Sequence, residues 1–133
     1  MKTAKFGGSS LANATQLKKV AEIIKSDNTR RFVVVSAPGK RYATDQKVTD
    51  LLVELYQKRM NNEATDDLIT KIFARYEEIS REFQIEKSIL TEIYQSLESL
   101  KNLPTADNPH FFDEILSNGE NNNAKLVAGV LQA

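Results

Sequence analysis

Cysteine is absent from this 133-residue sequence, and histidine occurs once, at His110. Disulfide bonds, thiolate zinc sites and cysteine nucleophiles are therefore excluded, and a metal centre built from histidines would have too few ligands. The sequence also lacks any apolar run near the roughly 20 residues that a membrane-spanning helix needs. Its N-terminal segment has no apolar core of the kind found in signal peptides. We therefore expect a cytoplasmic protein with no membrane partner.

An overall net charge is also lacking, because 18 basic side chains balance 18 acidic ones. The balance hides an asymmetry: residues 1–50 carry ten basic and four acidic side chains, a net charge of +6, and the remainder carries −6. A positive N-terminal segment indicates an anionic ligand nearby, although lysines on solvated helix faces are the ordinary alternative. The basic residues are spread along the chain without interleaved aromatic residues, which argues against nucleic acid as a partner.

The first 36 residues have the pattern of one βαβ unit. A short strand is expected over residues 2–6 and stops at a Gly-Gly turn, and a helix begins behind Asn13 as its N-cap. Residues 31–36 form a β-branched, nearly continuous apolar run, typical of a strand buried on both faces of a parallel sheet. Right-handed crossover geometry places the loops after both strands at one sheet edge, where ligands bind in open α/β folds.

The rest of the sequence predicts helices. Apolar spacing indicates amphipathic helices around residues 48–56, 68–83 and 89–97, the last two as a hairpin, and a final helix from about residue 124. We thus expect an α/β fold with two parallel strands and about five helices. Two strands leave the valine-rich strand short of neighbours. We therefore expect an incomplete sheet and the leading part of a longer domain.

The loop at Gly7, Gly8, Ser9 and Ser10 offers the parts of a phosphate cradle. It supplies unhindered backbone N–H groups and two hydroxyls, and Lys5 lies at the end of the strand before it. It is neither a P-loop nor a dinucleotide-binding fingerprint, because the required glycines are missing. On spacing alone the loop is as consistent with a tight turn as with a ligand site.

The same string, Lys-Phe-Gly-Gly-Ser-Ser over residues 5–10, resembles the opening signature of aspartokinases, in the amino acid kinase superfamily. Residues 33–37 resemble the second strand of that family, residues 49–52 its threonine-containing helix start, and Gly119-Glu120 its Gly-Glu substrate element. The resemblance covers the whole chain. It implies that residues 1–133 are the N-terminal, amino-acid-binding portion of a three-layer αβα amino acid kinase fold, as a single, truncated domain.

The resemblance further implies an activity. It is the ATP-dependent phosphorylation of the L-aspartate side-chain carboxylate to 4-phospho-L-aspartate, the first step towards lysine, threonine and methionine. L-Aspartate and ATP would be the partners, Mg²⁺ would be held mainly through the ATP phosphates, and the full-length protein would be a homo-oligomer. The glycine-rich nucleotide segment and the regulatory domains that the family places further along are missing, so we expect no kinase activity from this chain alone.

Site residues also follow from the resemblance. Those implied are Lys5, Gly7, Gly8 and Ser9 for the ATP phosphates and Ser36, Thr49 and Glu120 for aspartate. Lys5 would be the catalytic contact to the transferring phosphoryl group, and Glu120 would pair with the substrate ammonium. Thr44 is an alternative to Thr49, because it also precedes an aspartate. Plain structural roles remain open for both threonines as helix caps and for Glu120 as a solvated carboxylate.

Two other functions stay open. One is another amino acid kinase, acting on glutamate or acetylglutamate, against which Phe6, the Ser9-Ser10 pair and the Gly119-Glu120 element argue. The other is a non-catalytic interaction module built on the helical hairpin. The kinase chemistry suits a chain with a single histidine, because a carboxylate acceptor is already ionised at neutral pH and needs no general base.

Overall fold

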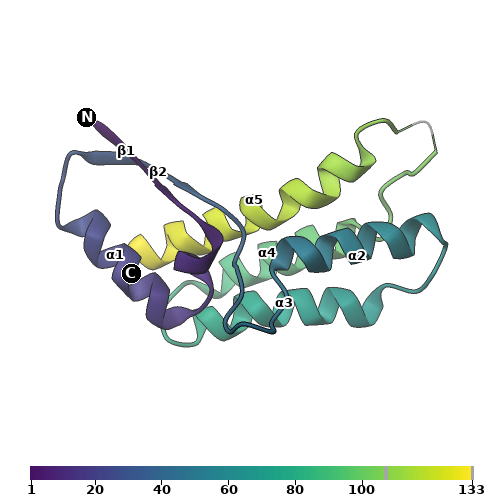
Figure 1. Cartoon of the computed structure of the whole chain (residues 1–133), viewed down its shortest axis with the longest axis horizontal. Coiled ribbons are helices and arrows are strands. Elements are labelled where there is room, and N and C mark those ends of the chain that lie inside the picture. The colour runs from purple at the N-terminus through teal and green to yellow at the C-terminus, as the bar shows by residue number, and fades with distance from the viewer. Residues whose placement is uncertain (107, 133) are drawn as a thin grey trace.

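A computed structural model describes residues 1–106 and 108–132 of the chain. In chain order the elements are β1 (Lys2–Phe6), the short 3₁₀ helix η1 (Gly8–Leu11), α1 (Ala14–Lys25), β2 (Arg30–Val35), α2 (Val48–Met60), α3 (Asp66–Ser80), α4 (Lys87–Ser99) and α5 (Phe111–Gln132). Figure 1 shows the two strands at one end of a layer of helices. Over the described residues, the expected two strands and five α-helices are confirmed.

The βαβ unit forms as its sequence pattern predicts. β1 and β2 pair in parallel, with Lys5 opposite Val34 and Phe6 opposite Val35. The Gln16 N–H donates to Asn13 Oδ1 over 3.0 Å, which confirms Asn13 as the N-cap of α1. The crossover through α1 brings the loops after both strands to one edge of the sheet.

Only one face of the strands is covered by the described helices. Val35 is 8% exposed and lies in the core, whereas Val34 and Phe32 on the opposite face are 49% and 55% exposed. The expectation that β2 is buried on both faces is therefore wrong for this chain. The reason is visible in Figure 1, where the helices lie to one side of the strands.

Helices α2 to α5 supply most of the hydrophobic core. The expected hairpin is present as α3 and α4, which pack against each other. Burying each large aliphatic side chain stabilises the fold by about 1.5–3 kcal/mol, so this layer is the main support of the sheet edge. Fully buried residues from it include Val48, Leu52, Leu55, Ile69, Ile72, Tyr76, Ile93, Leu97, Ile115 and Leu126.

Helix α5 differs from the expectation. The sequence predicts a final helix only from about residue 124, but one helix of 22 residues begins at Phe111 and runs through the three asparagines at 121–123. Two of the three are buried, because each finds an amide partner. Asn123 Nδ2 donates to the Ser36 carbonyl over 2.7 Å, and Asn122 Nδ2 donates to Asn118 Oδ1 over 2.6 Å. Asn123 thereby fixes the end of β2 against α5.

Gly119 lets α5 lie close to the sheet edge. A Cβ at this position would come within 2.9 Å of both Ala37 Cβ and Leu52 Cδ1, which is closer than carbon atoms pack. The Tyr76 hydroxyl donates to the Gly119 carbonyl over 2.8 Å, and burial raises the pKa of Tyr76, so that it stays a neutral donor. Glu120 is therefore held next to the loop that follows β2.

The first prediction concerns this contact. Gly119→Ala is expected to lower the free energy of unfolding by about 1–3 kcal/mol, because the added methyl overpacks the interface. It should also shift the backbone amide resonances of Ala37 and Glu120. Gly129→Ala is the control in the same helix. Its Cβ would come within 2.5 Å of Ile89 Cδ1, the end of a side chain that can rotate, and would otherwise meet only Ile85 at ordinary van der Waals distance. Unfolding in urea and amide chemical shifts measure both effects, and equal Glu120 shifts in the two variants would contradict the prediction.

Candidate functional site

Two adjoining cavities open at the sheet edge where both strands end. The first, here called the loop cavity, has a volume of about 460 Å³. The second, the helix cavity, has a volume of about 410 Å³. They share Ser36, Ala37 and Thr49, so together they form one cleft. The loop cavity is otherwise lined by Gly8, Ser9, Pro38, Gly39, Lys40 and Lys47, and the helix cavity by Asp113, Leu116, Ser117 and Glu120.

The two ends of the cleft differ in charge. Among the described residues, the charged residues that line the loop cavity are Lys40 and Lys47, and those that line the helix cavity are Asp113 and Glu120. Thr49 lies between the two ends in the first turn of α2, and the N-terminus of a helix favours negative charge. The cleft therefore suits a small ligand with a cationic group at one end and an anionic group at the other.

Five of the seven residues that the sequence analysis singled out line this cleft. They are Gly8, Ser9, Ser36, Thr49 and Glu120. Thr49 lines both cavities and the alternative Thr44 lines neither, so the structure places only Thr49 at the cleft. The structure brings Ser36 and Thr49 together with Glu120 from three separate parts of the chain.

Lys5 and Gly7 line neither cavity. Lys5 is the penultimate residue of β1 and is exposed, as is its register partner Val34. Over the described residues Lys5 forms no ion pair. A Cβ at Gly7 would meet nothing within 4 Å, so the fold does not require glycine there. The roles expected of Lys5 and Gly7 stay predictions.

Gly8 owes its position to a second glycine. The Gly39 N–H donates to the Gly8 carbonyl over 2.8 Å. A Cβ on Gly39 would lie 2.5 Å from the Gly8 carbonyl carbon and 2.8 Å from the Ser9 nitrogen, far inside van der Waals contact. The two loops therefore cross backbone to backbone, and only glycine fits at position 39. This crossing forms one wall of the loop cavity.

Backbone hydrogen bonds fix the middle of the cleft. The Ser36 N–H donates to the Phe6 carbonyl over 3.2 Å, which continues the strand pairing by one residue. The Val48 N–H donates to the Pro38 carbonyl over 3.0 Å and brings the start of α2 to the same loop. Ser36 and Thr49 are therefore positioned by the main chain, which leaves their hydroxyl groups available to a ligand.

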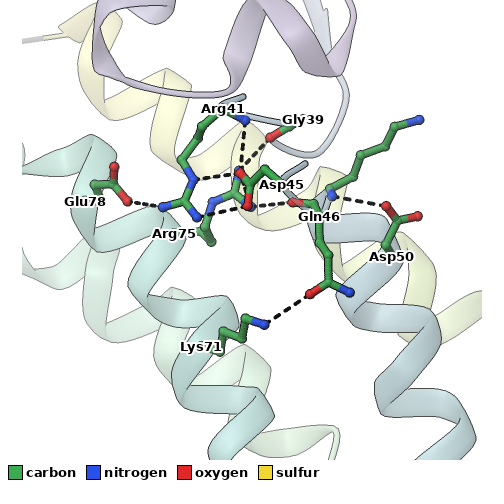
Figure 2. A network of polar contacts seen from close by, with 9 residues as sticks. Gly39, Arg41, Asp45, Gln46, Asp50, Lys71, Arg75 and Glu78 are labelled. Atoms are coloured by element: carbon green, nitrogen blue, oxygen red, sulfur yellow. Dashed lines mark hydrogen bonds and ion pairs between the residues drawn. The ribbon is translucent and has the colours of Figure 1, made fainter. Parts of the chain in front are cut away.

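An ion-pair network holds the loop over residues 39–46 against α3 (Figure 2). Arg41 Nε donates to Asp45 Oδ2 over 2.7 Å, and Arg41 Nη1 donates to Glu78 Oε2 over 2.8 Å. Hydrogen bonds from Arg41 hold the pKa of Asp45 well below its usual range. The Asp45 side chain is 8% exposed, so this charge is largely shielded from water.

This network yields a pH prediction. Because the pKa of Asp45 is depressed in the folded state, Asp45 stabilises the fold above its unfolded pKa of about 3.9. That contribution is lost as the pH falls below this value towards the folded pKa. We expect Asp45→Asn to remove the corresponding part of the acid dependence. Urea unfolding between neutral pH and about pH 3 compares the two proteins, and parallel curves for wild type and variant would contradict the prediction.

The sequence alone does not assign a role to several residues that form or support the cleft. Asp113 lies seven positions before Glu120, and this spacing places the two residues on one face of a helix. The sequence predicts this arrangement only if residues 111–132 are expected to form one continuous helix. Lys40 and Lys47 contribute to the positive charge of residues 1–50, which by itself assigns neither of them a specific role. Gly39 and Asn123 act through contacts between distant segments, for which one sequence carries no signal.

Within residues 1–106 and 108–132, no group of three His, Cys, Asp or Glu side chains lies close enough together to hold a metal ion. In the same part of the chain, no helix has both the length and the apolar character needed to cross a membrane.

The sequence is similar to known aspartokinases. Aspartokinase 3 of Bacillus subtilis (strain 168) is 43% identical over 128 residues, which cover 96% of this chain and 28% of that protein. The aspartokinase of Chlamydia pneumoniae is 36% identical over 126 residues, which cover 95% of this chain and 26% of that protein. The chain thus spans little more than a quarter of the length of these relatives.

The fold is similar to that of solved aspartate kinases. Clostridium acetobutylicum aspartate kinase matches with a TM-score of 0.81 and 36% identity, over 98% of this chain and 29% of that one. E. coli aspartokinase III, in a complex with aspartate and ADP, matches with a TM-score of 0.75 and 28% identity, over 98% and 28% of the respective chains. These likenesses confirm the expected α/β fold. The profile of the Amino acid kinase family matches residues 3–133, and the chain belongs to that family.

Proposed function

We propose that this chain is the aspartate-binding portion of an aspartate kinase. The observation that carries the proposal is the charge polarity of the cleft, with carboxylates at the helix cavity and lysines at the loop cavity. At neutral pH the α-ammonium of L-aspartate matches the acidic end of the cleft and its side-chain carboxylate matches the basic end. Its α-carboxylate, on the same carbon as the ammonium, is left to groups other than these charged residues. The similarity to aspartokinases, one of them in a complex with aspartate and ADP, supports this substrate.

The charges of the cleft support one orientation of the substrate, which we propose here. The α-ammonium lies in the helix cavity against Glu120, with Asp113 adding a second negative charge. The side-chain carboxylate then lies towards the loop cavity, between Ser36 and Thr49, whose hydroxyls can donate to it. This orientation points the acceptor carboxylate towards Gly8 and the basic end of the cleft.

Phosphoryl transfer in this arrangement depends on charge neutralisation. A carboxylate oxygen of aspartate attacks the γ-phosphorus of ATP, the bond to the β-phosphate oxygen breaks, and ADP leaves. The obstacle is the approach of one anion to another. Backbone N–H groups at Gly8 and Ser9, together with the cations at the loop cavity, lie where the negative charge accumulates. We propose that Lys5 and Gly7 add to this phosphate site in the complete catalytic domain.

The nucleotide and its cation are accommodated only in part. The loop cavity offers phosphate-binding groups, but its apolar lining is limited to Ala37, Pro38 and the glycines, which is no slot for an adenine ring. We propose that Mg²⁺ is held mainly through the ATP phosphates, in keeping with the lysines that are the charged lining of the loop cavity among the described residues. Its chemistry there would be to neutralise phosphate charge.

The chain corresponds to less than a third of the length of these relatives. We propose that residues 1–133 form the N-terminal portion of a larger catalytic domain that acts in the cytoplasm as a homo-oligomer. Its product, 4-phospho-L-aspartate, would feed lysine, threonine and methionine synthesis. By itself the 133-residue chain should bind aspartate without turning over ATP, and phosphorylation of aspartate by the purified chain would contradict this.

A ligand panel tests the substrate assignment. L-Aspartate, L-glutamate and N-acetyl-L-glutamate are each titrated into the ¹⁵N-labelled chain, and the amide resonances of Ser36, Thr49 and Glu120 are followed. We expect saturable shifts that are strongest with L-aspartate. N-Acetyl-L-glutamate should bind poorly, because it lacks the ammonium that the acidic end of the cleft attracts. Stronger binding of either glutamate compound would favour another amino acid kinase, and no binding at all would favour a non-catalytic module.

A further inference from the structure

Arg75 is a buried arginine that joins both ends of the loop between β2 and α2. It lies on α3, is 4% exposed and lines neither cavity of the cleft. Its Nη2 donates to the Gly39 carbonyl over 2.6 Å, and its Nη1 donates to the Gln46 carbonyl over 2.7 Å. Figure 2 shows Arg75 between these two carbonyls. One side chain thus ties together main-chain groups seven residues apart.

Burial and the nearby Arg41 lower the pKa of Arg75, and Asp45 offsets part of this cost. Asp45 Oδ2 lies 3.6 Å from Arg75 Nη1 and supplies a compensating negative charge. The Nε atom of Arg75 is buried and has no hydrogen-bond partner among the described residues. The side chain therefore acts through its two terminal nitrogens. A planar guanidinium can present two donors to two carbonyls at once, and a lysine ammonium lacks that fixed fork.

The contacts of Arg75 lead to the cleft through Gly39. The Gly39 carbonyl accepts from Arg75, and the N–H of the same residue donates to the Gly8 carbonyl over 2.8 Å. Gly39 also packs against the Gly8 backbone so closely that a Cβ does not fit. A change in the position of Gly39 must therefore move Gly8, because the two backbones are hydrogen-bonded and closely packed.

The far end of the loop is coupled in the same way. Arg75 holds the Gln46 carbonyl, and Lys47 and Thr49 of the cleft follow within three residues. Asp50 Oδ2 accepts from the Lys47 N–H over 3.1 Å and caps α2 at that point. Arg75 lies outside the cleft, and its two hydrogen bonds thus position both the phosphate side and the aspartate side of the cleft.

We propose that Arg75 is a positioning residue for phosphoryl transfer, which sets the place of Gly8 relative to Thr49 by holding the carbonyls of Gly39 and Gln46. The proposal rests on the function proposed above. Arg75 contacts no substrate and acts through the main chain of the loop. The phosphate-binding wall and the acceptor-binding wall therefore stay at a fixed separation, which in-line transfer requires.

Arg75→Lys in the 133-residue chain tests the proposal, because it keeps the charge and removes the fork. We expect hydrogen exchange of the Gly39 N–H to accelerate on the order of tenfold or more relative to global opening. The dissociation constant for inorganic phosphate, followed by the Gly8 and Ser9 amide shifts, should rise on the order of tenfold. The affinity for L-aspartate should fall less, because Glu120 lies on α5 and not on the loop that Arg75 holds.

Arg59→Lys is the matched control. Arg59 likewise donates from both terminal nitrogens to two main-chain carbonyls, those of Leu100 and Leu103, but lines neither cavity of the cleft. It should lower stability without changing Gly39 exchange or phosphate affinity. If Arg75→Lys does not fold, the wild-type chain provides a second test. Saturation with inorganic phosphate should slow exchange of the Gly39 N–H, and an unchanged rate would overturn the proposal.

The outcomes separate the positioning role from the proposed function. Unchanged Gly39 exchange in Arg75→Lys would overturn the positioning role, whatever the ligands do. Faster exchange with unchanged phosphate affinity would also overturn it, since Arg75 would then support the loop alone. A wild-type chain that binds neither phosphate nor L-aspartate would instead overturn the proposed function of the cleft.

Discussion

Gly39→Ala is expected to abolish phosphate binding at the loop cavity. The added Cβ would come within 2.5 Å of the Gly8 carbonyl carbon and 2.7 Å of its oxygen, and neither backbone atom can rotate away. The two loops must therefore separate, which removes one wall of the cavity. We expect a loss of stability of about 1–3 kcal/mol or more from overpacking. Titration of inorganic phosphate, followed by the Ser9 amide shift, measures the binding, and urea unfolding measures the stability.

Gly129→Ala is the control for this experiment. Gly129 lies on α5 and lines neither cavity, and an added Cβ there would also be overpacked, at 2.5 Å from Ile89 Cδ1. The variant should lose stability and still bind phosphate as the wild type does. If Gly39→Ala kept phosphate affinity within a factor of about two, the assignment of Gly39 as the wall of the phosphate site would be wrong.

Glu120→Gln is expected to weaken L-aspartate binding by about tenfold and to leave phosphate affinity unchanged. The carboxylate is proposed to accept from the substrate ammonium, and a hydrogen bond to a charged group contributes roughly 1.5–3 kcal/mol. A difference of about 1.4 kcal/mol is tenfold in a dissociation constant. Calorimetric titrations of L-aspartate and of inorganic phosphate measure the two affinities separately.

Two further variants sharpen the test of Glu120. Glu114→Gln removes an exposed carboxylate from α5 that lines neither cavity, and it should change neither affinity. Asp113→Asn should give a smaller loss of aspartate affinity, because Asp113 adds charge at the same end of the cleft. Equal losses of aspartate and phosphate affinity in Glu120→Gln would defeat the assigned role.

The βαβ unit is the part of the fold that the sequence predicts best. β1 is bounded as expected, and β2 begins and ends only one residue earlier than its β-branched run. Asn13 caps α1 as its position predicts. These features depend on interactions within a few residues, such as capping and side-chain patterning, and one sequence contains that information. The meeting of the two loops at one edge then follows from chain topology.

Helix α5 shows where local patterns fail. Gly119 and the asparagines that follow it disfavour a helix interior by local preference, so a break is the natural expectation. The break does not occur because the glycine lets α5 approach Ala37, and Asn123 finds the Ser36 carbonyl as its partner. Both causes lie more than 60 residues away in sequence, and tertiary contacts of this kind override local propensity.

The candidate site was predictable to a similar extent. Gly8, Ser36, Thr49 and Glu120 were found through family resemblance, and all four line the cleft. The role of Arg75 in holding the loop behind these residues could not be predicted, because nothing in the sequence distinguishes Arg75 from other arginines in helices. Its role depends on which carbonyls α3 happens to face, and that is decided by the packing of α3 against the loop.

The orientation of L-aspartate in the cleft tests the central claim most directly. A crystal structure of the chain with L-aspartate and inorganic phosphate would locate both ligands. We expect the α-ammonium of aspartate against Glu120, its side-chain carboxylate between Ser36 and Thr49, and phosphate beside Gly8. Aspartate bound in the reverse direction, or both ligands bound away from the ends of β1 and β2, would contradict the account.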